Sequence, residues 1–186
     1  MRARTGSTWS APVFTAAGVL LLAWFAFGRG HRVPLLGLVD LGVHELGHLL
    51  FAAAPGLLPV FAGNGLQTAL PLLVAAGFYF GRRDLPATGL CVAWSGTTLQ
   101  DASVYIADAP YQALPLLKEG SIHDWAYILG PDHLDALGSA AAIASYVNHV
   151  GLLVLVSGFC ICLSPLLLAQ REPDTVETEW PVHGVE

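Results

Sequence analysis

The sequence predicts an all-helical (all-α) membrane protein, a polytopic bundle of about five transmembrane helices with a capping loop between the fourth and fifth. Two observations support this fold class. Hydrophobic residues make up 54% of the chain and charged residues only 12%, against about 25% charged residues in an ordinary soluble domain. The mean hydropathy is +0.59, and apolar residues gather in runs near the roughly 20 residues that a helix needs to cross a bilayer.

Five apolar segments are the expected spans. The first covers residues 11–28 and follows Arg2 and Arg4. We expect it to remain an uncleaved helix, because no clear small-residue cleavage site follows it. The second covers residues 33–54 and has Pro34 near its start, where proline suits a helix. The remaining three spans are expected over residues 66–80, 85–107 and 150–169.

We expect one integral membrane domain over residues 1–170 and a flexible acidic tail over residues 171–186. The tail carries most of the net charge of −6, and no basic patch suggests nucleic acid as a partner. Residues 108–136 are charged and contain proline and glycine, which predicts a structured cap or a partly re-entrant segment. Its chemistry-bearing residues are expected to be solvated loop residues, with closure of the site or local hydrogen bonding as the alternatives: His123, Asp124, Asp132 and His133.

The amino-acid usage indicates where the protein resides. Seven of the eight basic residues are arginine, and alanine, glycine, proline and leucine are abundant, which is typical of a GC-rich bacterial genome. We therefore expect a bacterial inner membrane protein whose partners are lipids and other membrane helices. The three cysteines lie in apolar runs, and an odd number there predicts small apolar fillers without a disulfide framework.

The second predicted span contains the motif His44-Glu45-Leu46-Gly47-His48, which matches H-E-x-x-H. On a helix, positions i and i+4 are neighbours on one face, so both imidazoles can bind one zinc ion. Glu45 lies beside that face and can carry a proton from water to a leaving amine. Ionisable residues are costly inside a membrane and usually serve a site. The alternative is a pair of core histidines that are hydrogen-bonded within the bundle.

A catalytic zinc ion needs a third protein ligand and an open position. Asp101 is the best candidate, because it lies in the fourth predicted span, where an unpaired carboxylate would be costly. Asp101 could instead pair with a polar neighbour such as Gln100 or Arg83. His149 is the competing third ligand, although its place at the start of the last span also suits a structural role.

Two further residues extend the candidate site. Asp40 lies one helical turn before His44, where it could orient that imidazole, bind the metal itself or hydrogen-bond between helices. Tyr105 lies one turn after Asp101 and could donate a hydrogen bond to an oxyanion or to a ligand carboxylate.

The intramembrane motif from His44 to His48 resembles that of the site-2-protease family of membrane-embedded zinc metallopeptidases, especially its short bacterial branch without a PDZ domain. The resemblance implies that His44 and His48 are zinc ligands, that Glu45 is the base and that an aspartate on a later span is the third ligand. The family's Asn-x-x-Pro and Asp-Gly pattern is absent here, since Ala102 follows Asp101.

Three functions therefore compete. The first is an intramembrane zinc metallopeptidase that hydrolyses peptide bonds of membrane or membrane-proximal substrates. The second is a non-catalytic subunit or scaffold of a larger membrane complex that keeps a metallopeptidase-like fold. The third, a haem or chlorophyll site, ranks last because it leaves Glu45 without a role and because histidines at i and i+4 cannot bind both faces of one haem.

Overall fold

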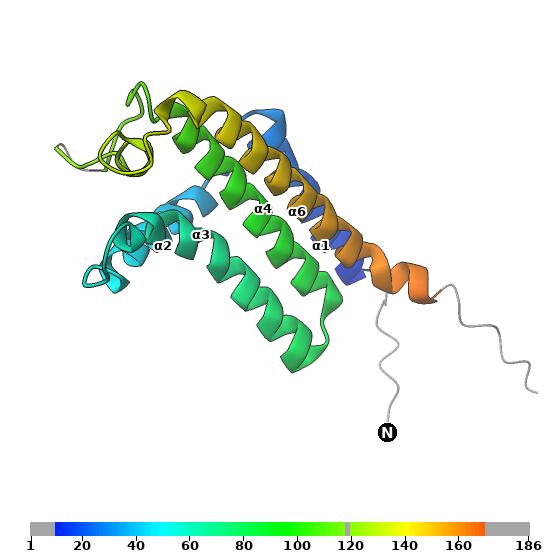
Figure 1. Cartoon of the computed structure of the whole chain (residues 1–186). Coiled ribbons are helices and arrows are strands. Elements are labelled where there is room, and N and C mark those ends of the chain that lie inside the picture. Colours follow the sequence, from blue (N-terminus) through cyan, green and yellow to red (C-terminus); the bar gives the residue numbers. More distant parts are fainter. Residues whose placement is uncertain (1–9, 118–119, 170–186) are drawn as a thin grey trace, which may run out of the picture.

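The computed structural model describes residues 10–117 and 120–169. Within these ranges the chain is helical and contains no strand, so the all-helical prediction is confirmed (Figure 1). The predicted acidic tail over residues 171–186 lies outside the described residues.

Helix α4 (Leu85–Asp108) is the centre of the bundle. It packs against α1 (Ser10–Ala23), α3 (Leu58–Gly77) and α6 (Ala140–Ala169), and Figure 1 shows α4 and α6 side by side. Its first turn is fixed by Asp84, whose side chain accepts a hydrogen bond from the backbone N–H of Ala87 at 3.0 Å. Such an N-cap satisfies a backbone donor that the helix itself leaves unpaired.

Glycines allow α4 and α6 to approach closely. A Cβ atom on Gly96 would lie 2.6 Å from the carbonyl oxygen of Gly151, and one on Gly158 would lie 2.5 Å from the amide nitrogen of Ala93. Backbones in such close contact gain van der Waals packing, which is a main source of helix association in lipid. The two helices therefore form one rigid wall of the bundle.

Three helical segments are long and apolar enough to cross a membrane, namely Ser10–Gly28, Leu58–Arg82 and Leu137–Leu168. The first is α1 extended by the π-helical turn η1 (Trp24–Gly28), and the second is α3 extended by η2 (Phe78–Arg82). The third is α6 preceded by the short turn η3 (Leu137–Ser139). Large apolar side chains on these segments point outward and are exposed, as lipid contact requires: Phe14, Leu20, Leu73, Phe80, Leu153 and Leu167.

The prediction of five spans is not confirmed. The predicted span over residues 33–54 forms α2 (Leu36–Leu50), which has 15 residues and is about 22 Å long, short of a bilayer of about 30 Å. Helix α4 covers the predicted fourth span, but it is too polar to qualify. Its buried threonines, serines and glutamine face other helices, so protein neighbours replace lipid around it.

The loop after α4 docks on the end of the bundle where α2 and α3 meet. It contains the short helix α5 (Asp124–Leu129), which packs against α3 and α4. Ile128 and Leu129 are buried with Ile106 of α4 and Ala140 of α6. This apolar anchor holds the start of α5, and with it Asp124, against the end of the bundle.

We expect Gly96→Ala to lower the free energy of unfolding by about 1–3 kcal/mol, because the added methyl group meets the Gly151 carbonyl. Thermal unfolding in detergent micelles measures this as a lower Tm. Gly77→Ala is the control, because nothing lies within 4 Å of a Cβ atom there, and it should leave Tm unchanged or raise it slightly. Equal Tm values for the two variants would contradict the close packing of α4 and α6.

Candidate metal centre

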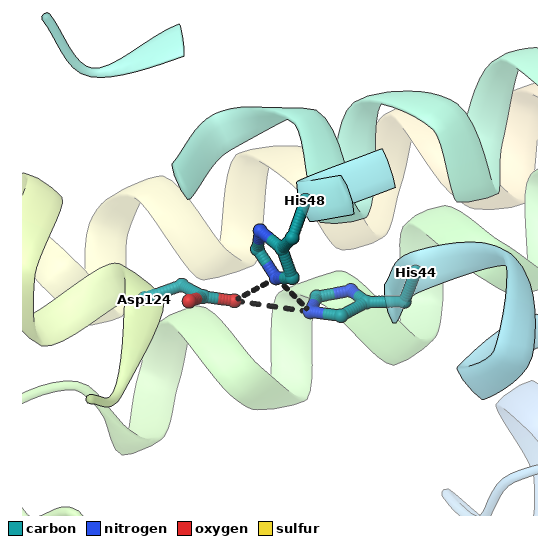
Figure 2. Close-up of side chains that lie close together, drawn as sticks. All are labelled: His44, His48 and Asp124. Atoms are coloured by element: carbon teal, nitrogen blue, oxygen red, sulfur yellow. Dashed lines mark hydrogen bonds and ion pairs between the residues drawn. The ribbon is translucent and has the colours of Figure 1, made fainter. Parts of the chain in front are cut away.

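Three side chains from two distant segments converge at the end of the bundle (Figure 2). The Nε2 atoms of His44 and His48 lie 3.0 Å apart. The Oδ2 atom of Asp124 lies 3.0 Å from Nε2 of His44 and 3.2 Å from Nε2 of His48. These three residues offer one ligand atom each, and the arrangement could hold a metal ion.

The distances among the three ligand atoms fit a small tetrahedral metal ion. Bonds of about 2.0–2.2 Å from such an ion to its ligands place the ligand atoms about 3.3–3.6 Å apart. The observed triangle, with edges of 3.0–3.2 Å, needs only a small expansion to accept it. Three protein ligands leave a fourth tetrahedral position open.

Glycines make room for the two imidazoles. His44 and His48 project from α2 onto α3 at Gly63, where a Cβ atom would lie 2.6 Å from Nε2 of His48 and 2.7 Å from Nε2 of His44. On α2 itself, a Cβ atom on Gly47 would collide with the carbonyl oxygen of Ala62. The metal centre therefore requires that α2 and α3 meet backbone to backbone.

The outer ring nitrogens of both histidines face hydrogen-bond acceptors. Nδ1 of His48 lies 2.8 Å from the carbonyl oxygen of Pro59. Since a carbonyl oxygen only accepts, this nitrogen carries the proton. Nδ1 of His44 lies 3.3 Å from Oε1 of Gln67, which leads to the same conclusion once the orientation of the Gln67 amide is known.

A chain of hydrogen bonds determines that orientation. The indole N–H of Trp125 donates to Oδ1 of Asn64 at 2.8 Å, and Nδ2 of Asn64 donates to Oε1 of Gln67 at 3.2 Å. Nε2 of Gln67 donates to Oδ2 of Asp101 at 3.1 Å. Trp125 can only donate and an ionised Asp101 can only accept, so both amides between them have one possible orientation. Oε1 of Gln67 therefore faces His44 as an acceptor.

When both imidazoles are neutral, the three ligand atoms therefore all present lone pairs to one another. With Nδ1 protonated on each ring, the neutral imidazoles of His44 and His48 have bare Nε2 atoms, and these point at the Asp124 carboxylate. Such an arrangement is repulsive without a cation between the atoms. A proton can bridge only two of the three atoms, whereas a metal ion binds all three lone pairs at once.

The sequence predicted Asp101 as the third ligand, next to the two imidazoles. The structure does not place it there. One Asp101 oxygen accepts a hydrogen bond from Nε of Arg32 at 2.6 Å, and the other accepts from Gln67. Its half-buried charge is thus explained by an ion pair with Arg32 and a hydrogen bond from the Gln67 amide. Asp124 takes the place predicted for Asp101, and the prediction that Asp124 is a solvated loop residue is wrong, because only 9% of it is exposed.

The other candidates lie at different distances from the centre. Asp40 is buried and accepts a hydrogen bond from the Trp94 indole at 2.8 Å, so it joins α2 to α4 without contacting the ligand atoms. His149 is exposed, and its Nδ1 lies 2.6 Å from the carbonyl oxygen of Ser145 on the same helix. This contact satisfies His149 within α6, away from the metal centre.

Tyr105 does lie at the centre. Its hydroxyl oxygen accepts a hydrogen bond from the backbone N–H of Asp124 at 3.2 Å. The hydroxyl proton has no acceptor among the residues that the structure describes. Tyr105 therefore fixes the start of α5 and keeps one donor available beside the metal ligands.

The residues around Asp124 hold it in position. His123 is almost fully buried, and its Nδ1 caps α5 by accepting from the N–H of Ala126 at 3.2 Å, while its Nε2 lies 3.3 Å from Oδ2 of Asp108. Burial acts to raise the pKa of Asp108, but hydrogen bonds from Leu114, Ala113 and His123 outweigh it and hold that pKa below its usual value.

No local spacing connects Asp124 to the motif, since it lies 80 residues from His44 in the chain. A local signal is the acidic residue within the triplet His123-Asp124-Trp125, because acidic residues are common in the first turn of a helix. That signal does not indicate that this turn is buried against the motif.

A cavity of about 430 Å³ adjoins the metal centre. His44, Glu45 and Tyr105 line it, together with the Arg32–Asp101 ion pair. Glu45 is exposed to the cavity and makes no hydrogen bond to another residue within the described part of the chain. A carboxylate in this position is available to exchange protons with a molecule in the cavity.

Comparison of the chain with protein-family models, with curated proteins and with solved structures found no match. The geometry and chemistry of the site are therefore the basis for its functional interpretation.

We expect Asp124→Ala to abolish binding of a divalent metal ion and Asp101→Ala to weaken it without abolishing it. The reason is that Asp124 contributes a ligand atom, whereas Asp101 acts on His44 only through Gln67. Metal content of the purified variants, measured by mass spectrometry, checks this. Full loss of metal in Asp101→Ala together with retention in Asp124→Ala would restore the ligand set that the sequence predicted.

We expect Gln67→Met, which removes the acceptor for Nδ1 of His44, to weaken metal affinity by about 10–100-fold. A competition titration with a metal-binding dye measures the dissociation constant. Gln100→Met is the matched control, because Gln100 is also a buried glutamine beside the cavity but makes no hydrogen bond to either imidazole. An equal loss of affinity in both variants would exclude a specific role for Gln67.

Proposed function

We propose that this protein is a zinc metallopeptidase of the membrane, in which His44, His48 and Asp124 hold the zinc ion and Glu45 transfers protons. The observation that carries the proposal is the convergence of three lone-pair-bearing atoms within 3.0–3.2 Å of one another. Two histidines and a carboxylate with an open fourth position are a donor set typical of catalytic zinc.

The roles of the surrounding residues follow from their chemistry. A zinc ion held by these three residues would act as a Lewis acid, which would polarise a carbonyl group and make water a better nucleophile. Glu45 accepts a proton from the attacking water and delivers it to the leaving amine. The Tyr105 hydroxyl, with its oxygen held by the N–H of Asp124, donates its free proton as a hydrogen bond to the carbonyl oxygen, where negative charge develops.

The peptide bond is the substrate that best fits this set of groups. H-E-x-x-H places a proton-transferring glutamate next to two metal ligands, which suits hydrolysis of an amide whose leaving amine must be protonated. The resemblance of this motif to that of the site-2-protease family supports the same reaction. Three helices suited to a membrane, and a preference for arginine over lysine among the eight basic residues, support a location in a bacterial inner membrane.

We expect Glu45→Gln to keep its zinc but to lower the rate of peptide hydrolysis by about 10²–10⁴-fold, because the amide cannot accept the proton. Cleavage of a fluorogenic peptide mixture, together with metal content, measures both properties. Asp132→Asn is the control, since it makes the same chemical change at an exposed carboxylate in the loop after α5. Full activity of zinc-loaded Glu45→Gln would exclude Glu45 as the base and with it the proposed function.

A further inference from the structure

We infer that the metal centre lies at the membrane–water boundary and acts on an extended segment of polypeptide at the membrane surface. The substrate class is thus a juxtamembrane stretch or a chain end, and a helix within the lipid is excluded. This inference rests on the proposed function. It is carried by the depth of the centre along α3 and α4 and by the chemistry of the residues that line the adjoining cavity.

The position of the centre along α3 gives its depth. The membrane-suited segment Leu58–Arg82 ends in Arg82 and is followed by Arg83, so charged side chains mark one membrane boundary. A helix crosses about 30 Å in roughly 20 residues, and counting back that number from Arg82 ends at Gly63, five residues after the segment begins at Leu58. Gly63 is the residue against which both imidazoles pack. The centre therefore lies at the opposite boundary.

Helix α4 leads to the same depth. It runs from Leu85, next to the boundary marked by the arginines, to Asp108. Tyr105, whose hydroxyl meets Asp124, lies three residues before that end, a distance of about 4.5 Å. Helix α5 comes after the end of α4 in the chain. Figure 1 shows α5 at the same end of the molecule as α2 and the first turns of α3.

A helical segment shields its carbonyl groups, because its backbone hydrogen bonds are made within the helix and its side chains surround the backbone. An extended strand of a few residues is narrower and presents its carbonyl groups freely. The substrate segment therefore has to be unfolded before it enters.

The walls of the cavity also suit an extended peptide at a water boundary. Charged and amide side chains of Arg32, Glu45 and Gln100 lie on the wall with the apolar side chains of Leu41, Val104 and Leu116. Such a lining offers hydrogen-bond partners to a peptide backbone and apolar surface to its side chains. A site for a helix in lipid would be lined by apolar and small residues.

Thiol labelling tests the depth without relying on activity. In a variant with Cys91, Cys160 and Cys162 replaced by alanine, Val104→Cys in the cavity wall should react with a charged, membrane-impermeant methanethiosulfonate in lipid vesicles. Leu73→Cys, in the middle of α3, should react at least 100-fold more slowly, although Leu73 is 64% exposed and Val104 only 40%. Protection of both cysteines would overturn the boundary position.

Substrate placement tests the class. One degenerate ten-residue segment is inserted at the centre, at the N-terminal boundary or at the C-terminal boundary of a 20-residue Leu/Ala transmembrane helix, and products are identified by mass spectrometry. We expect cleavage at least ten-fold faster at one boundary than at the centre, and none with Glu45→Gln. If Glu45-dependent cleavage at the centre is as fast as at the boundaries or faster, the inference is overturned but the proposed function is not. If none of the three substrates shows Glu45-dependent cleavage, the proposed function is overturned.

Discussion

Both imidazoles of the motif are held by their outer nitrogens, and this constraint determines what the rest of the site can be. A carbonyl oxygen of α3 holds His48, and a side-chain amide of α3 holds His44. Each ring, when neutral, therefore keeps its proton on the outside and its lone pair on the inside. The Asp124 carboxylate then faces two atoms of like character, and the cluster becomes stable when a cation lies between them.

The Gln67 amide, which accepts from His44, is itself held by residues of α4, of α5 and of the loop before α2. Trp125 of α5 acts on it through Asn64, and Arg32 of the loop before α2 acts on it through Asp101. A buried polar network is favourable only when every member is satisfied, and here the described side chains form a closed set. The half-buried position of Asp101 reflects this supporting role, which explains why its place in a helix resembles that of a ligand.

The sequence predicted the helical class and the paired histidines, because both depend on short-range patterns. Apolar runs reveal helices that face lipid, and the four-residue spacing places His44 and His48 on one face. The predicted spans at α4 and α2 are not confirmed, because α4 is polar and packed among other helices and α2 is short. Composition alone does not state which solvent a helix faces.

Asp124, the third residue of the candidate ligand set, could not be predicted from the sequence. The physical reason differs from that for the helices. Asp124 reaches the histidines because Ile128 and Leu129 bury themselves beside Ile106 and because Tyr105 receives its backbone N–H. These contacts are long-range, and their sequence signal is one turn of helix in a loop. Sequence patterns favour a carboxylate on a predicted span, such as Asp101, as the third ligand, because a long apolar helix is easier to recognise than a docked loop.

Asp124 lies on a six-residue helix of the docked loop. A metal ion that uses Asp124 as a ligand therefore couples its binding to the docking of this loop. Any metal ion that binds the docked form and not the undocked form stabilises docking by linkage, by about 2.7 kcal/mol when its free concentration is 100 times its dissociation constant. Conversely, loss of the metal leaves three mutually repelling atoms that favour release of the loop. The cavity beside Glu45 borders the same loop at Leu114 and Leu116, so a metal ion held by His44, His48 and Asp124 would also influence the shape of this cavity.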